Sequence, residues 1–270
     1  MRVAVVGHVE WVEFVRVPHV PAQGEILHAT AAWGEPGGGG AVAAVQLARL
    51  GGGADFFTAL GDDELGRRAH RELAALGVRV HVAWRAEPQR RAVTFVDDGG
   101  ERTITVIGER LGPRGGDELP WDELAAADGV YFTAGDAAAL RRARAARVLT
   151  ATPRALATLR EGGVELDALI GSGRDPGEVY APGDVVPPPR LVVRTFGADG
   201  AVAEPGGRFA ASPLPGPRAD AYGAGDSFAA CLTFALAQDL PLGEAMELAA
   251  RCGAAALTGR GAFEGQLRPG

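Results

Sequence analysis

The stretch Asp220-Ala-Tyr-Gly223-Ala224-Gly225-Asp226 leads into apolar residues at helical spacing, namely Phe228, Cys231, Leu232 and Leu236. Because residues 223–225 are small, backbone N–H groups can approach an anion at the start of this helix, where the helix dipole adds partial positive charge. Asp226 falls in the first turn, where it can accept a proton from a hydroxyl that attacks phosphorus. The stretch therefore predicts a general base and an anion hole, the two halves of a phosphoryl-transfer site.

The same residues also fit a simpler interpretation, in which the glycines only close a turn and Asp226 only caps the helix. Three other segments favour the catalytic interpretation. They are Pro36-Gly37-Gly38-Gly39-Gly40-Ala41-Val42, Thr58-Ala-Leu-Gly61-Asp62-Asp63-Glu-Leu-Gly66 and Leu191-Val-Val-Arg-Thr195-Phe-Gly197-Ala-Asp-Gly200. In this order, the four segments resemble the motifs of the ribokinase-like, PfkB-type carbohydrate and nucleoside kinases over about residues 2–265. Four ordered matches are far more specific than one.

The resemblance implies an ATP-dependent kinase that phosphorylates a hydroxymethyl group of a small sugar, sugar derivative or nucleoside. Asp226 is then the general base, and the amides of Gly223, Ala224 and Gly225 form the anion hole. Mg²⁺ is expected to bridge the ATP phosphates. Relatives often hold a monovalent cation beside the anion hole as well.

The resemblance also assigns residues to the two substrates. Thr195, Gly197 and Gly200 correspond to family positions near the nucleotide phosphates. Gly38 and Gly39 correspond to the acceptor site, where missing side chains permit close approach. We expect these five residues to line the two halves of the active site.

The acceptor site departs from the family pattern at two kinds of position. Relatives carry Gly-x-x-Asn-x-Asp after the first strand, whereas this chain has Glu10 and Val12 at the Asn and Asp positions. The Asn that closes the glycine-rich family segment is Val42. Two hydroxyl-binding side chains are thus replaced by valine, so free ribose or fructose is expected to bind poorly. The acceptor would instead present an apolar or aromatic part to the valines, with Glu10 or Glu13 meeting a remaining hydroxyl.

The metal-binding segment departs as well. Relatives carry Asn-x-x-Glu after the corresponding strand, and that carboxylate helps hold Mg²⁺; the aligned residues here are Ser172 and Asp175. A hard cation with oxygen ligands and retained waters tolerates both changes, so these two are the predicted metal-site residues. The alternative is an ordinary polar turn, since Asp175 precedes a proline. Arg174 in the same loop is placed to meet a transferred phosphate.

Composition sets the class of protein. The 270 residues carry a net charge of -7, which argues against a nucleic-acid partner. All 27 basic residues are Arg, so a P-loop, which needs Lys, is excluded. Cys231 and Cys252 are expected to be buried thiols. With no run long enough for a membrane span and no signal peptide, we expect a cytoplasmic enzyme without a membrane partner. Its partners are ATP and a small-molecule acceptor.

Alternating strands and helices predict one α/β domain over residues 1–270, with a doubly wound, mostly parallel sheet flanked by helices. The expected strands are 2–6, 54–60, 147–152, 167–171 and 191–195, and the expected helices are 41–50, 63–76 and two within 222–257. Two β-rich segments, about 9–33 and 91–108, interrupt the alternation. They resemble the small β lid of sugar and nucleoside kinases, and the family expectation is a possible homodimer through this lid.

Two other functional classes stay open. Gly38-Gly-Gly40-Ala-Val-Ala43 fits Gly-x-Gly-x-x-Ala, a pattern of NAD(P)-dependent oxidoreductases, although it does not directly follow the first buried strand. The altered acceptor and metal positions also fit a pseudokinase that senses a nucleotide or metabolite without turnover. The presence of Asp226 favours a catalyst.

Overall fold

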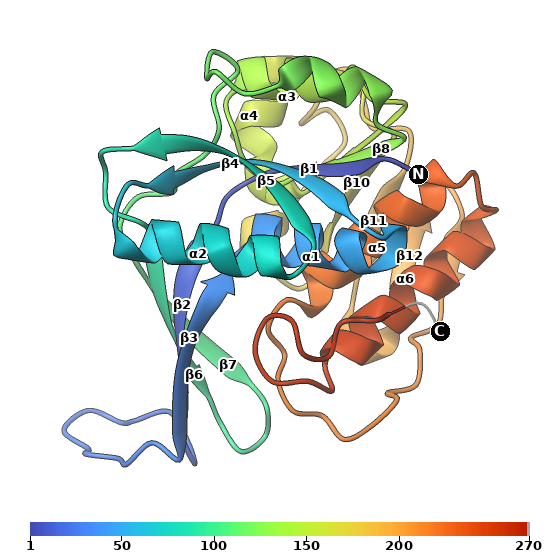
Figure 1. Ribbon diagram of the computed structural model, residues 1–270. Helices are drawn as coiled ribbons and strands as arrows, with labels where there is room; N and C mark the ends of the chain where they lie inside the picture. The colour runs from blue at the N-terminus through green and yellow to red at the C-terminus, as the bar shows by residue number, and fades with distance from the viewer. Residues whose placement is uncertain (269–270) are drawn as a thin grey trace.

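A computed structural model describes residues 1–268 and shows a nine-stranded sheet between two layers of helices, with a separate four-stranded sheet beside it (Figure 1). The large sheet has the order β13-β12-β11-β10-β9-β8-β1-β4-β5. Its strands are β1 (Val3–Val6), β4 (Ala54–Gly61), β5 (Val78–Arg85), β8 (Gly129–Phe132), β9 (Val148–Ala151), β10 (Ala168–Ser172), β11 (Val192–Thr195), β12 (Ala201–Glu204) and β13 (Gly207–Phe209). The pairs from β5 to β11 are parallel, and β12 and β13 add an antiparallel edge.

The centre of this sheet is the apolar strand β1, whose four residues are all buried. It pairs with β4 on one side and with β8 on the other. The chain therefore first builds the half of the sheet that contains β4 and later returns to build the half that begins with β8. Such a reversal leaves a crevice at the carboxyl ends of the strands, where ligands of open α/β sheets bind. The fold therefore positions a site just after β1 and β8.

Helices cover both faces of the sheet. They are α1 (Gly39–Gly51), α2 (Glu64–Ala75), α3 (Ala137–Ala143), α4 (Leu156–Gly162), α5 (Ala224–Ala237) and α6 (Leu242–Ala256). One apolar cluster joins α1, α2, α5 and α6 to one face, and a second joins α3, α4 and a 3-10 turn at Trp121–Ala126 to the opposite face. Figure 1 shows these two layers above and below the strands. The predicted doubly wound architecture is confirmed.

The small sheet is built by the two segments that interrupt the core. Its order is β3 (Ala31–Gly37), β2 (Glu10–Arg16), β6 (Arg91–Val96) and β7 (Arg102–Ile107). The turn Asp97-Asp-Gly-Gly100 joins β6 to β7, with Gly100 at φ 71°. Buried and exposed residues do not alternate regularly along β2, because its first three residues are all buried. We call this four-stranded sheet the lid.

Some elements were not predicted. Strand β5 carries alternating Val and polar residues, and only its first residue is fully buried beside β4. The β12–β13 hairpin is short and turns at Pro205 and Gly206, so it reads as a loop in the sequence. Cys231 and Cys252 are buried, as expected. Within residues 1–268, every helix is too short or too polar to cross a lipid bilayer.

The Gly61 and Gly66 pair explains why the segment after β4 is rich in glycine. A Cβ atom built on Gly66 would overlap the carbonyl oxygen of Gly61, so the start of α2 can approach the end of β4 only without a side chain. Asp63 caps α2 by accepting a hydrogen bond from the Gly66 amide at 2.9 Å. The close approach fixes where α2 begins.

We predict that Gly66→Ala lowers the free energy of unfolding by about 1 to 3 kcal/mol, because the added methyl group forces backbone apart. Thermal and denaturant unfolding measure the change. Gly243→Ala is the matched control, since a Cβ atom at this helical position meets no neighbouring atom within 4 Å. Equal stability of the two variants would contradict the close approach.

Candidate active site

The predicted base lies where two helix N-termini meet. Asp226 is in the first turn of α5, which begins after Gly223 at φ 74°, and α1 begins after Gly38 at φ 83°. A Cβ atom on Gly39 would lie 2.7 Å from Oδ1 of Asp226. Glycine at position 39 is therefore required for the first turn of α1 to reach the carboxylate. The structure brings the predicted acceptor glycines and the predicted base into one place.

The loop before α5 is held by buried polar contacts. The Gly38 amide donates a hydrogen bond to the Tyr222 hydroxyl at 2.8 Å, which ties the two helix starts together. The Asp220 carboxylate accepts from the amides of Tyr222 at 2.8 Å and Gly261 at 3.1 Å. Arg102 of the lid strand β7 donates to the Ala221 carbonyl at 2.6 Å. These contacts fix the position of the loop from which residues 223–225 lead into α5.

The surrounding protein changes the acidity of Asp226. Burial, followed by the negative charge of Glu178, raises its pKa to about 6, while Arg102 and Arg154 act in the opposite direction. A carboxylate with this pKa is ionised at neutral pH yet accepts a proton more readily than an ordinary Asp. Its basicity therefore suits proton abstraction from an alcohol during a reaction.

Glu178 is a site residue that the sequence did not reveal. Its Oε2 accepts from the Ser172 amide at 2.6 Å, and its Oε1 accepts from Arg154 Nε at 2.8 Å. A 3-10 turn at Pro176–Glu178 folds this carboxylate back onto the end of β10. The sequence spacing after Ser172 conceals the contact, because Glu178 lies three positions beyond the aligned residue Asp175.

The predicted metal-site residues lie in the same loop. The Ser172 hydroxyl accepts from the amides of Arg174 at 3.1 Å and Asp175 at 3.2 Å, and Asp175 pairs with Arg154 while capping the 3-10 turn. Together with Glu178 they supply the hard oxygen donors that Mg²⁺ prefers. This set of donors fits a magnesium ion. Among charged groups, Glu178 has the largest effect on the pKa of Asp226.

The predicted nucleotide residues lie on the neighbouring strands. Thr195 ends β11, and Gly197 at φ 63° and Gly200 at φ 83° flank the 3-10 turn Gly197–Asp199 that leads into β12. Arg174 pairs with Asp199 across this turn. These residues lie beyond β10, at the carboxyl end of β11.

The predicted acceptor residues divide into two groups. Glu10 is buried beside the Gly38 backbone, and its Oε1 lies 2.8 Å from Arg90 Nε and 3.7 Å from His8 Nε2. Val12 and Val42 are fully buried in the core, where Val42 packs against Gly223. The structure offers no exposed valine surface here, so contact between the valines and an acceptor stays a prediction.

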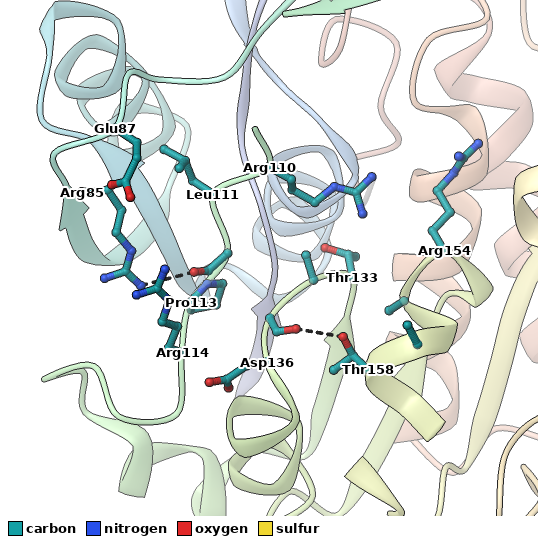
Figure 2. Close-up of a pocket in the computed structure, with 15 residues that line it drawn as sticks. Arg85, Glu87, Arg110, Leu111, Pro113, Arg114, Thr133, Asp136, Arg154 and Thr158 are labelled. Carbon is teal, nitrogen blue, oxygen red and sulfur yellow. Dashed lines mark hydrogen bonds between the residues drawn. The ribbon is translucent and has the colours of Figure 1, made fainter. Parts of the chain in front are cut away.

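An open cleft of about 300 Å³ adjoins this site. It is formed by the ends of β5, β8 and β9 and by the segment that returns from the lid, residues 110–114. Its lining includes Arg85, Arg110, Arg114 and Arg154 but only two acidic residues, Glu87 and Asp136. Figure 2 shows the Arg110 side chain lying above Thr133 and reaching toward the side from which Arg154 rises. No spacing in the sequence indicates this gathering of cations.

The glycines that resemble a dinucleotide fingerprint have a different setting. The segment 38–43 follows lid strand β3 rather than the buried strand β1, and its first residues contact Asp226. A dinucleotide fingerprint would follow the first core strand directly. The lidded α/β core, with a carboxylate between two helix N-termini, defines instead the class of small-molecule phosphotransferases.

Comparison with known proteins agrees with this class. A model of the pfkB family of carbohydrate kinases matches residues 1–159 and 184–267, and the chain belongs to this family. It is an ATP-dependent carbohydrate or nucleoside kinase. A curated relative, the ATP-dependent ribose-1-phosphate kinase of Halopiger xanaduensis, is 31% identical over 94% of this chain and 91% of its own.

Solved structures of low identity share the fold. A microbiome-derived acarbose kinase has a TM-score of 0.79 and 22% identity, covering 99% of this chain and 96% of its own. The ribokinase of Cryptococcus neoformans, solved with ADP, has a TM-score of 0.73 and 22% identity, covering 99% and 97%. The predicted ribokinase-like fold is therefore confirmed.

We predict that Asp226→Asn makes the protein more stable above pH 6. The folded pKa of about 6 exceeds the unfolded value of about 4, so ionisation opposes folding. The penalty is absent below about pH 4, grows between the two pKa values and is constant above them. The variant carries no such penalty. Melting temperatures from pH 4 to 8 should diverge as pH rises, and a difference independent of pH would contradict the raised pKa.

Proposed function

We propose that this protein transfers the γ-phosphoryl group of ATP to a hydroxymethyl group of a small sugar derivative, with Asp226 as general base. The observation that carries the proposal is the carboxylate of raised pKa enclosed by the N-termini of α1 and α5. The position is favourable because backbone amides and a proton acceptor lie within one helical turn.

The proposed step assigns a role to each group. The acceptor hydroxyl oxygen forms a bond to the γ-phosphorus, the bond from that phosphorus to the β–γ bridging oxygen breaks, and ADP leaves with the electron pair. Asp226 receives the hydroxyl proton. The amides of Gly223, Ala224 and Gly225 would stabilise charge on the transferred group. Mg²⁺, when bound, neutralises the ATP phosphates, and Glu178, Asp175 and Ser172 are the residues that would hold it.

The acceptor class is proposed from two observations. The curated relative is named for a sugar phosphate, ribose 1-phosphate. The cleft that adjoins the site is lined by four arginines, and the two valines at the family's hydroxyl-binding positions are buried. Both observations favour a sugar derivative over free ribose or fructose. Thr195, Gly197 and Gly200, at and after the end of β11, would contact the nucleotide.

The lid suggests an assembly. All six residues of its edge strand β7 are exposed, including Ile104, Val106 and Ile107. An exposed apolar strand edge is a template for pairing with another chain. We infer that two copies associate through their lids, and sedimentation of the wild type and of a Val106→Lys variant measures this association.

We predict that Asp226→Asn lowers kcat by about two to four orders of magnitude while ATP still binds, because the amide keeps the shape but accepts no proton. Steady-state kinetics and nucleotide titration measure the two effects separately. The wild-type profile of kcat/KM against pH should fall on the acidic side with a pKa near 6. Turnover near the wild-type rate in the variant would exclude Asp226 as the base and leave the nucleotide-sensing alternative.

We predict that Gly225→Val preserves folding but abolishes use of ATP. A Cβ atom on Gly225 meets no neighbouring atom within 4 Å, so the side chain points into open space at the start of α5. That space is where the transferred phosphate would lie. An unchanged melting temperature with kcat/KM for ATP reduced at least ~100-fold is expected. Normal kinetics in a folded variant would remove residues 223–225 from the anion hole.

A further inference from the structure

Three arginines from separate segments lie in or beside the cleft that adjoins the candidate site. Arg90 precedes lid strand β6, Arg110 follows lid strand β7, and Arg154 lies in the turn after β9. All three lower the pKa of the buried His8, which burial lowers most. Arg90 and Arg154 also lower the pKa of Arg110 itself, after the larger effect of its burial. Arg110 and Arg154 line the same cleft, and Arg90 contacts Glu10 beside it.

The neighbouring carboxylates do not neutralise this cluster equally. Arg90 pairs with Glu10, and Arg154 pairs with Asp175 and Glu178. Among residues 1–268, no carboxylate lies within ion-pair distance of Arg110. Glu10, which pairs with Arg90, still raises the pKa of Arg110 through its negative charge. Arg110 retains exposure to the cleft. One positive charge at the cleft is thus left to be balanced from outside the protein.

Two buried polar atoms beside the cluster also lack partners. Thr133 is 2% exposed and His8 is 7% exposed, yet Thr133 Oγ1 and His8 Nδ1 have no hydrogen-bond partner in the described structure. Thr133 lines the cleft below Arg110 (Figure 2). Buried polar atoms without partners are costly, and a bound ligand is one way to satisfy them. Thr133, Arg110 and Arg154 line one cleft, so a ligand that enters it meets cationic side chains.

We propose that Arg110, with Arg90 and Arg154, binds a phosphate group that the acceptor already carries, so that the substrate is a sugar monophosphate. This assignment rests on the proposed function. Guanidinium groups pair with phosphate oxygens through forked hydrogen bonds, and a phosphate of nearly two negative charges balances a cluster of excess positive charge. A sugar ring would then extend from the cluster toward Asp226.

The position of the cluster separates it from the nucleotide. The residues assigned to ATP follow β11, whereas Arg110 lies in the cleft at the ends of β5, β8 and β9. Arg154 lines this cleft and also pairs with Asp175 and Glu178 in the loop after β10. The cluster and the residues assigned to ATP therefore follow different strands of the sheet, as separate sites for the two substrates require.

The test compares wild type, Arg110→Ala and Arg110→Lys with the control Arg71→Ala, an exposed arginine on α2 far along the chain from the site. Acceptors are ribose 1-phosphate, ribose and a sugar acid, each with saturating ATP. We expect Arg110→Ala to lower kcat/KM for the sugar phosphate about 10- to 100-fold and Arg110→Lys to lower it less. The KM for ATP and the activity of Arg71→Ala should be unchanged.

A second measurement does not depend on turnover. Binding of ribose 1-phosphate to the nucleotide-free protein should be weakened by Arg110→Ala but not by Asp226→Asn. Inorganic phosphate should compete with the acceptor and not with ATP. Because Arg110 makes no ion pair in the described structure, the variant should keep its melting temperature.

Several results would overturn the assignment. Unchanged sugar-phosphate binding in Arg110→Ala would do so, as would a rise in KM for ATP alone, which would assign the cluster to the nucleotide. Equal use of the sugar acid would replace phosphate by a carboxylate. If Arg110-dependent binding is found without turnover in the wild type, the phosphate site stands and the proposed kinase step fails.

Discussion

The site depends on holding one carboxylate at the meeting point of two helix N-termini. Each helix end favours a nearby anion by about 0.3 to 1 kcal/mol. The rise in the pKa of Asp226 to about 6 corresponds to about 3 kcal/mol against ionisation, so burial and the Glu178 charge outweigh both helix ends. The helix ends are then left to stabilise the charge that arrives with a substrate. Gly39 and the bond from Gly38 to Tyr222 are what make this meeting possible.

The sequence was sufficient where a local steric requirement leaves few residue choices. Glycines at 38, 39 and 223 mark helix starts that need positive φ or close approach, and apolar runs such as β1 mark buried strands. Edge strand β5 was missed because its polar residues resemble a loop rather than a buried strand. The fold class, the lid strands and the order of the core elements could thus be predicted from the amino-acid sequence alone.

The remaining site residues were hidden because their relation is purely spatial. Arg90, Arg110 and Arg154 lie in three segments that only the lid and the returning sheet bring together. Glu178 reaches the end of β10 through a turn that the family spacing does not predict. No single spacing encodes these contacts. Because every basic residue of the chain is Arg, residue type does not distinguish a functional arginine from an ordinary surface arginine.

The lid connects the two kinds of recognition. Through Arg102, strand β7 holds the Ala221 carbonyl beside residues 223–225, the proposed anion hole, and the segments that flank β6 and β7 carry Arg90 and Arg110. Relatives of this family fix a sugar by hydrogen bonds from Asn and Asp, at positions where this chain has Glu10, Val12 and Val42. A hydrogen bond with the lost Asn contributes about 0.5 to 1.5 kcal/mol, and one with the charged Asp, like each bond between a guanidinium group and phosphate, about 1.5 to 3 kcal/mol. Two or three contacts to the proposed phosphate would therefore offset the hydroxyl contacts that the valines remove, and an acceptor held by charge at its far end would leave its hydroxymethyl group free to face Asp226.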